Sequence, residues 1–290
     1  MGREFEGPAG RDIPDDRARP FTAVVLAADR TASDQVAAKA GVACKAFAPV
    51  GGVPMVLRVV DALQAAGTVG RIVLCGPPAA ILDKLPELKR RIDAGELAWC
   101  PSLGSPSQSA AAALSAVGPD QPVLLTTADH ALLRADIVDY FVRQSRASGA
   151  DATVALVKHS TVLEKFPSTK RTVLRMRDGH FCTCNLFAFM SPRARKILTL
   201  WRGVEQRRKM PRRLIAGLLG IWGVAAYLLG WLSMAGALRR VSMRIGAELS
   251  LVLMPIADAG VDVDTPADLE LVESLLGGAG VARAGDPQGS

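Results

Sequence analysis

Three charged residues follow predicted strands, directly or after a loop, where their side chains could handle phosphate groups. Arg30 and Lys45 follow the apolar run 23–27, and Asp129 follows the run 122–127. Phosphoryl-type transfer depends mainly on positioning and on neutralising negative charge, which lysine and arginine can supply. A carboxylate that leaves a buried strand is costly unless it caps a helix or holds a cation. These residues therefore predict chemistry on a phosphorylated substrate, with a helix-capping role for the acid left open.

The elements that must position these residues alternate between strands and helices. Uninterrupted apolar runs suit strands that are buried on both faces of a parallel sheet. The predicted strands are 23–27, 71–75, 122–127, 152–157 and 249–255. Residues 55–66, with apolar side chains at helical spacing, and 79–94 are predicted as helices, and a turn at 177–180 predicts a hairpin into a strand at 181–189. In a sheet of this βαβ order, ligands lie at the carboxyl ends of the strands.

The sequence on either side of Lys45 resembles the opening signature of a known family, the MobA-like nucleotidyltransferases. The strings LAADR and CKAFAPVGGVPMVLRVVDAL follow its usual form, LAGG, an arginine-containing loop and K-x-L-x-x-V-x-G-x-P, except that Ala28-Asp29 replaces the glycine pair. A carboxylate at this position would repel a triphosphate unless it turns away or meets a metal. The resemblance implies nucleotide binding at Leu26, Ala27 and Ala28, with Lys45 and Arg30 as catalytic residues.

Two later motifs follow in the family's order, and both carry acids. The string TTADH contains Asp129, and GVDVDTPADLELVESLL contains Asp264. In the family, the first acid binds Mg²⁺, which bridges phosphate oxygens, and the residue just before T-P completes the metal site. The resemblance therefore implies that Asp129 and Asp264 hold Mg²⁺ as the cofactor, with Asp262 as second choice and Asp268 as a helix cap.

Three further residues are candidates for contact with the base or the acceptor. Ser107, in the string PSLGSPSQS before an alanine-rich helix, matches the loop that reads the base in the family, and plain helix capping explains it equally well. Arg171 lies in a basic run and could hold the acceptor's phosphate by bidentate contacts, or could belong to a solvated hairpin face. Asn185 resembles the residue that begins the acceptor-side strand of the family, with a packed polar strand residue as the alternative.

The fold that the resemblance implies is an α/β three-layer sandwich with a mainly parallel twisted sheet and one antiparallel strand, like that of the nucleotide-diphospho-sugar transferases. We expect one domain over 21–276, with a disordered tail at 1–20 and a flexible tail at 277–290, because neither end shows an apolar period. A basic and apolar helical insertion is predicted at 202–246, near the C-terminal third.

The stretch 214–238 carries no charge and follows a strongly basic segment at 202–213. Its length and polarity allow a bilayer span, but the chain must then return to the sheet to deliver Asp264 with no second hydrophobic crossing. Its glycines favour two short helices that are broken near Gly230. The interpretations are a helical lobe over the acceptor site or a patch on an anionic membrane surface, with a span as the third alternative.

Charge and composition limit the partners. The chain has 35 Lys+Arg against 28 Asp+Glu, a net charge of +7, and only 5% aromatic residues, which is poor for base stacking. We therefore expect no nucleic-acid partner. Five scattered cysteines and a charged, proline-rich beginning predict a cytoplasmic location, with peripheral membrane contact as an option.

By resemblance, the sequence predicts a Mg²⁺-dependent nucleotidyltransferase. Such an enzyme transfers an NMP from an NTP to a phosphorylated small-molecule acceptor and releases pyrophosphate. Two alternatives stay open: a catalytically silent homologue that binds nucleotide, which the missing glycine pair favours, and a membrane-peripheral protein that uses 202–240. The base and the acceptor are left open as well.

Overall fold

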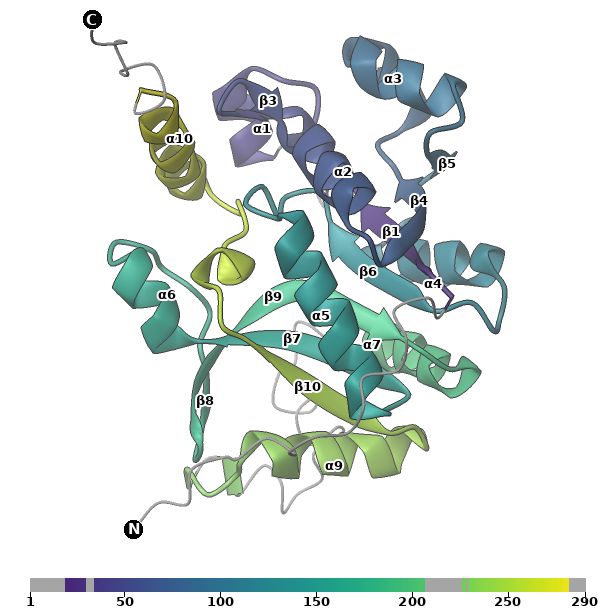
Figure 1. The fold of residues 1–290 in the computed structure, drawn as a ribbon, viewed down its shortest axis with the longest axis vertical. Helices are drawn as coiled ribbons and strands as arrows, with labels where there is room; N and C mark the ends of the chain where they lie inside the picture. The colour runs from purple at the N-terminus through teal and green to yellow at the C-terminus, as the bar shows by residue number, and fades with distance from the viewer. Residues whose placement is uncertain (1–18, 30–33, 207–225, 228, 282–290) are drawn as a thin grey trace, which may run out of the picture.

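The computed structural model describes residues 19–29, 34–206, 226–227 and 229–281, and a single twisted sheet runs through its centre (Figure 1). The strands are β1 Phe21–Leu26, β4 Val69–Cys75, β5 Ala98–Cys100, β6 Val123–Thr127, β7 Ala152–Lys158, β8 Leu174–Met176, β9 Gly179–Phe189 and β10 Leu249–Met254. Their order is β10-β7-β9-β6-β1-β4-β5, with β8 paired to β9. β9 runs antiparallel to β6, β7 and β8, and the other pairs of this sheet are parallel. The predicted mainly parallel sheet with an antiparallel strand is confirmed.

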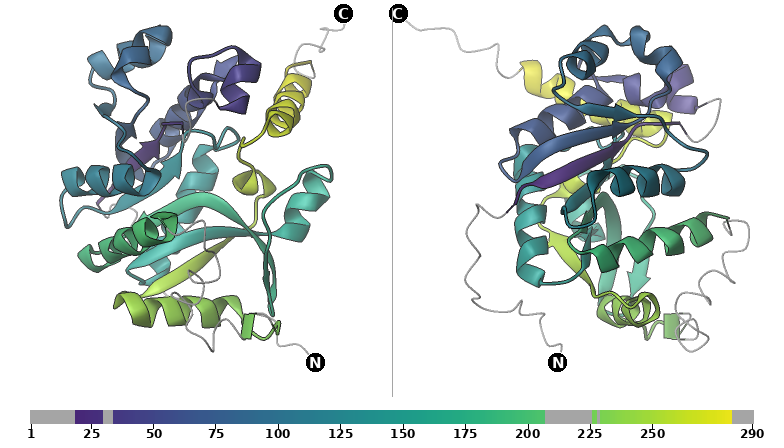
Figure 2. Two further views of the ribbon diagram at one scale, coloured as in Figure 1. Left: turned by 180° about the vertical axis from the view of Figure 1, so that it is seen from behind. Right: turned by 90° about the vertical axis from the view of Figure 1, so that its right-hand side faces the viewer.

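Helices cover both faces of this sheet (Figure 2). α2 (Met55–Ala65) and α5 (Ala135–Ser148) pack on one face, and α4 (Pro106–Val117) and α7 (Lys196–Gln206) pack together on the other. The remaining described helices are α1 Gln35–Ala40, α3 Pro86–Asp93, α6 His159–Lys165, α9 Met234–Ile245 and α10 Pro266–Val281. Short 3₁₀ turns lie at Lys45–Phe47, Ala79–Lys84, Pro192–Arg195 and Ala257–Gly260, and β2 (Pro49–Val50) pairs with β3 (Val53–Pro54). The predicted three-layer sandwich is confirmed.

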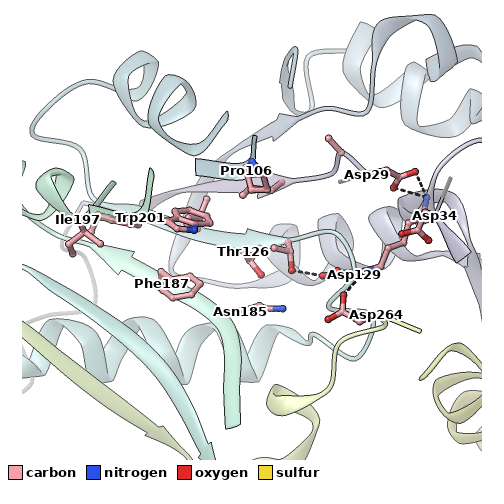
Figure 3. Close-up of a pocket in the computed structure, with 16 residues that line it drawn as sticks. Asp29, Asp34, Pro106, Thr126, Asp129, Asn185, Phe187, Ile197, Trp201 and Asp264 are labelled. Atoms are coloured by element: carbon pink, nitrogen blue, oxygen red, sulfur yellow. Dashed lines mark hydrogen bonds and ion pairs between the residues drawn. The ribbon is translucent and has the colours of Figure 1, made fainter. Parts of the chain in front are cut away.

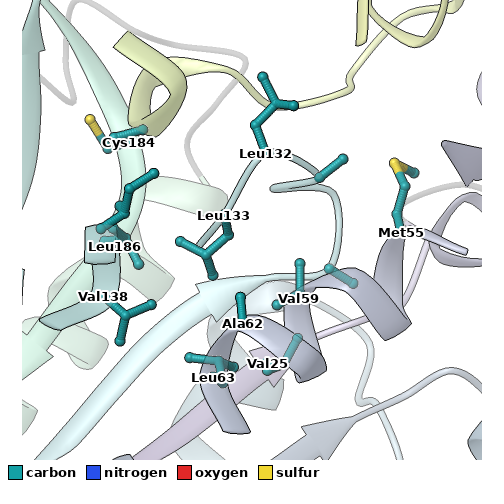
Figure 4. Packing of buried hydrophobic residues seen from close by; sticks show 14 of the residues in the cluster. Val25, Met55, Val59, Ala62, Leu63, Leu132, Leu133, Val138, Cys184 and Leu186 are labelled. Carbon is teal, nitrogen blue, oxygen red and sulfur yellow. The ribbon is translucent and has the colours of Figure 1, made fainter. Parts of the chain in front are cut away.

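Both faces of β1 are buried, as the uninterrupted apolar run 23–27 predicts. Ala23 and Val25 belong to the core on the side of α2 and α5, together with Val59 and Leu63 of α2 (Figure 4). Val24 belongs to the opposite core, on the side of α4 and α7. The strand is thereby fixed from both sides, and the loop that follows it starts from a rigid base.

The continuous helix predicted at 79–94 is wrong. A 3₁₀ turn ends at Lys84, and the separate helix α3 begins at Pro86. Proline lacks an N–H and its ring clashes with the preceding turn, so it breaks a helix from within but fits the first position of a new one. The helix predicted at 55–66 is confirmed as α2.

The insertion predicted at 202–246 falls partly within the described residues. α7 ends at Gln206, α9 begins at Met234 and packs against β10, and 207–225 lies outside the described part of the chain. Gly230 has a left-handed φ of 70°, so no helix runs through it. In the described ranges, no helix combines the length and apolar character that a membrane crossing needs.

The predicted tails are only partly described, and the domain boundaries stay predictions. Residues 1–18 and 282–290 lie outside the described residues, whereas the carbonyl of Pro20 accepts a hydrogen bond from the Gln121 side chain at 2.8 Å. α10 continues to Val281, beyond the boundary that the sequence predicted at 276.

Candidate functional site

One ammonium group lies between the carboxylates of Asp129 and Asp264 (both labelled in Figure 3) at the carboxyl edge of the sheet. The Nζ of Lys45 donates to Asp129 Oδ2 at 2.6 Å and to Asp264 Oδ1 at 2.8 Å. The three residues come from the 3₁₀ turn after β1, the loop after β6 and the segment before α10. The structure therefore brings together three of the residues that the sequence predicted as one site.

Strand pairing explains why these distant segments meet. β1 and β6 are parallel neighbours in which Leu26 lies opposite Thr127, so the loops that follow the two strands leave the sheet at the same edge. The C-terminal segment is fastened there by the backbone N–H of Val263, which donates to the Asp129 carbonyl at 3.0 Å. Asp264 is the next residue.

The charges of this cluster stabilise one another. Burial alone would lower the pKa of the Lys45 ammonium, but the charges of Asp129 and Asp264 outweigh burial and raise that pKa above its ordinary value. Burial alone would raise the pKa of Asp129, but the charge of Lys45 and hydrogen bonds from Lys45 and Thr127 lower it. Burial, with the negative charges of Asp129 and Asp264, raises the pKa of the neighbouring Asp262 to about 6.

Asp29, which stands in place of a motif glycine, holds the turn that carries Lys45. Its two carboxylate oxygens accept from the backbone N–H of Lys45 at 3.0 and 3.2 Å. Burial raises the pKa of this carboxyl, and the hydrogen bond from the Lys45 backbone opposes the rise. The carboxylate therefore has a partner within the loop, although it still lines the adjacent cavity.

A cavity of about 570 Å³ begins at this cluster and extends along β6 and β9 (Figure 3). Its charged end is lined by Asp29, Asp34, Lys45, Asp129 and Asp264. Thr126 and Asn185 follow, and the far end is lined by Leu125, Phe187, Phe189, Ile197 and Trp201. The cavity thus joins an ionic end to an apolar end.

A second, smaller cavity of about 140 Å³ adjoins the first and shares the walls Leu26, Ala28, Asp29 and Pro106 with it. Its other walls include Cys75 at the end of β4, and Gly104, Ser105 and Ser109 around the N-terminus of α4. A helix N-terminus with hydroxyl groups nearby suits a polar ligand, whereas the Glu205 carboxylate, which also lines this cavity, disfavours an anionic one.

The residues predicted to bind the nucleotide lie near these cavities in different ways. Leu26 and Ala28 line both cavities, whereas the N–H of Ala27 donates to the Cys75 carbonyl at 2.9 Å and so continues the sheet. Ser107 is fully buried, and its hydroxyl and N–H both donate to the Glu205 carboxylate. Ser107 lines neither of the two cavities, so base reading by its hydroxyl stays a prediction.

The two predicted acceptor residues meet at one carboxylate. Asn185 lines the larger cavity, has a left-handed φ of 48°, and donates through Nδ2 to Asp262 Oδ2 at 2.7 Å. Arg171 is almost fully buried, and its guanidinium donates to Asp262 and to Asp268, the latter at 3.2 Å. Phosphate binding by Arg171 stays a prediction, because its guanidinium donates to these two carboxylates and to the Thr169 hydroxyl, and it is not a wall of the cavity. Arg30 lies outside the described residues.

Sequence reasoning did not identify the apolar end of the cavity. Asn185, Phe187 and Phe189 alternate along β9 and therefore share one face, and Ile197 and Trp201 are four residues apart on α7 and share another. The alternation in NLFAF was the available signal for the strand residues. The pairing of α7 with β9 across a cavity depends on tertiary packing, which a helical pattern does not give.

The charged end offers ligands that suit Mg²⁺. Within the described residues, no group of three or more His, Cys, Asp or Glu side chains is arranged to hold a metal by itself. Mg²⁺ in nucleotide-dependent enzymes is usually held by one or two carboxylates together with substrate phosphates. Asp129 and Asp264, which already converge on one cation, fit that donor set.

Comparisons with known proteins bear on the family and the fold. The family model for the MobA-like NTP transferase domain matches residues 23–216. A hypothetical transferase from Thermus thermophilus is 33% identical, with a TM-score of 0.70 over 87% of this chain and 99% of that one. Two further solved structures share the fold: CMP:2-keto-3-deoxy-manno-octonic acid synthetase in complex with CTP, at 15% identity, and 4-diphosphocytidyl-2C-methyl-D-erythritol synthase from Anaerococcus prevotii, at 11%. Each gives a TM-score of 0.53 over 89% of this chain and 99% of its own. No curated protein matches the sequence.

Proposed function

We infer that this chain, a nucleotidyltransferase that belongs to the MobA-like NTP transferase family, transfers an NMP from an NTP to a phosphorylated small-molecule acceptor and releases pyrophosphate with the help of Mg²⁺. The observation that carries the proposal is the convergence of Asp129 and Asp264 on the amine of Lys45 at the carboxyl edge of the sheet. Ligands of open α/β sheets bind at this edge.

The balance of charge in the larger cavity supports a role for a divalent cation. Among the described residues that line the larger cavity, four are acidic (Asp29, Asp34, Asp129 and Asp264) and a single one, Lys45, is positively charged. Such a wall repels a triphosphate, since like charges at close range disfavour one another. A bound Mg²⁺ would offset the negative charge that develops during transfer. Asp129 and Asp264 are the residues that would hold it.

The residues of the site then have distinct roles. Lys45 leaves its carboxylate partners and neutralises the phosphates and the departing pyrophosphate, and Asp29 fixes the backbone that carries it. The small polar cavity beside α4 receives the base, which sets the α-phosphorus against the larger cavity. Asn185 lies on the acceptor side.

The reaction needs no protein base. An oxygen of the acceptor's phosphate attacks the α-phosphorus in line, the bond from that phosphorus to the bridging oxygen of the β-phosphate breaks, and pyrophosphate leaves with the electron pair. A phosphate monoester is already an anionic nucleophile at neutral pH, so positioning and charge neutralisation are the remaining tasks.

Pyrophosphate release measured with each of the four NTPs, against a panel of phosphorylated sugars, polyols and alcohols, tests the proposal. We expect Lys45→Ala and Asp129→Asn to lower the rate by about 100-fold or more, the scale on which removal of a charge-stabilising group acts. Lys89→Ala, which removes a lysine from the exposed face of α3, is the matched control. Nucleotide binding without pyrophosphate release from any acceptor would favour the catalytically silent alternative.

A further inference from the structure

We propose that the acceptor carries an apolar chain next to its phosphate, and that this chain binds between β9 and α7. The inference rests on the proposed function and names the substrate class of the same site. Its binding place, which we call the apolar arm, is the end of the larger cavity lined by Leu125, Phe187, Phe189, Ile197 and Trp201.

The apolar arm is continuous with the reaction site. Figure 3 shows Trp201, Ile197 and Phe187 at one end of the cavity and Asp129 and Asp264 at the other. Thr126 of β6 and Asn185 of β9 lie between the two ends. A molecule with an anionic head and an apolar tail can therefore place its phosphate at the metal-binding carboxylates and its tail in the arm.

Space of this kind requires an explanation. Protein interiors pack as densely as organic crystals, and an apolar cavity beside polar groups is the common form of a small-molecule site. Leu125 and Phe189 are buried, while Phe187, Ile197 and Trp201 pack against the core of α4 and α7 yet still border the cavity. These side chains are held in place by packing, and the space between them stays open.

A nucleotide base suits the arm poorly. A base carries several hydrogen-bonding groups along one edge, and burying them against aromatic and aliphatic side chains costs free energy for each group that loses water. The smaller cavity, with Gly104, Ser105 and Ser109 at the N-terminus of α4, offers polar partners instead. A hydrocarbon chain loses no hydrogen bonds in the arm and gains from the removal of its surface from water.

A homologous series of acceptors tests the inference on the full-length protein. Pyrophosphate release is measured with methyl, butyl, hexyl and octyl phosphate and with glycerol 3-phosphate, at a fixed concentration of the preferred NTP. Burial of each methylene group is worth about a 3- to 4-fold increase in kcat/KM until the arm is filled. We expect this rise for the alkyl series and a low value for glycerol 3-phosphate.

Variants assign the effect to the arm. Trp201→Ala and, as a milder change, Ile197→Ala are expected to flatten the dependence on chain length, whereas Trp231→Ala, which alters a tryptophan that is 68% exposed and outside the cavity, keeps the wild-type slope. NTP affinity measured without acceptor reports on folding and on the base site together. A folded Trp201→Ala protein that loses NTP affinity as strongly as it loses octyl phosphate turnover would place the base in the arm and overturn the inference.

The two proposals fail in different ways. Pyrophosphate release that is equal for methyl and octyl phosphate, or higher for the polar acceptors, overturns the apolar chain and leaves the transferase proposal intact. No release from any acceptor with any NTP overturns the proposed function, and the inference falls with it.

Discussion

Replacement of Lys45 by alanine is expected to make the nucleotide-free protein bind a divalent cation more tightly. A cation that reaches the carboxylates must displace the Lys45 ammonium, which donates to Asp129 at 2.6 Å and to Asp264 at 2.8 Å. A hydrogen bond between charged groups contributes about 1.5–3 kcal/mol when it is shielded from water, and we assign about 1.5 kcal/mol to the Asp129 contact. The Asp264 side chain is 51% exposed, so screening reduces its contact to about 0.5 kcal/mol.

The sum of about 2 kcal/mol corresponds to an affinity roughly 30-fold higher in Lys45→Ala. Titration with Mn²⁺, followed by the electron paramagnetic resonance signal of the free ion, measures this affinity without turnover. Lys45→Arg keeps the positive charge and is expected to stay near the wild-type value, and Asp129→Asn is expected to weaken binding in either background. A folded Lys45→Ala protein that binds Mn²⁺ no more tightly than the wild type would refute the assignment of the two carboxylates as the cation site.

Arg171→Ala is expected to lower the free energy of unfolding by about 3 kcal/mol, because it leaves the largely buried carboxylates of Asp262 and Asp268 without their cation. Urea denaturation measures the loss, and unchanged stability with weaker acceptor binding would favour the phosphate role that the sequence predicted. Trp231 and Met243, which are 68% and 71% exposed, lie close in sequence to the exposed arginines of α9, so we expect the protein to sediment with phosphatidylserine vesicles more than with phosphatidylcholine vesicles. Equal sedimentation with both, or no effect of Trp231→Ala, would argue against membrane contact.

The parts of the fold that sequence predicts well are those that depend on local pattern. The run 23–27 has no polar residue, which is typical of a strand with helices on both faces, and Val24 and Val25 indeed enter opposite cores. The position of Asp129 is predictable in the same way, since residues that follow parallel strands leave the sheet at one edge. Asp264 follows no strand directly: it lies between the 3₁₀ turn Ala257–Gly260 and α10, and the hydrogen bond from the Val263 N–H to the Asp129 carbonyl holds its segment beside Asp129. The motif supplied the identity of both acids, and tertiary packing supplied their proximity.

The parts that sequence misses depend on partners far away in the chain. Arg171 belongs to a basic run, which predicts a solvated or phosphate-binding side chain, but Asp262 and Asp268 reach it from the C-terminal segment. Ser107 likewise bonds to Glu205 of α7, and no local pattern signals that contact. A charge or hydroxyl pattern gives the chemistry that a residue can do, and only packing decides which partner takes up its hydrogen bonds.

The replacement of the motif's glycine pair by Ala28-Asp29 also has a structural explanation. Gly76, at the end of β4, has a φ of +79°, and a Cβ there would lie 3.2 Å from the Cβ and 3.3 Å from the N of Ala28. Because Gly76 has no side chain, it leaves room for the methyl group of Ala28. Asp29 then bonds to the Lys45 backbone and fixes the turn that delivers the amine. Gly76 thus provides the space around the loop and Asp29 its rigidity, in place of the motif's glycine pair. This argues against the altered motif as a sign of lost catalysis.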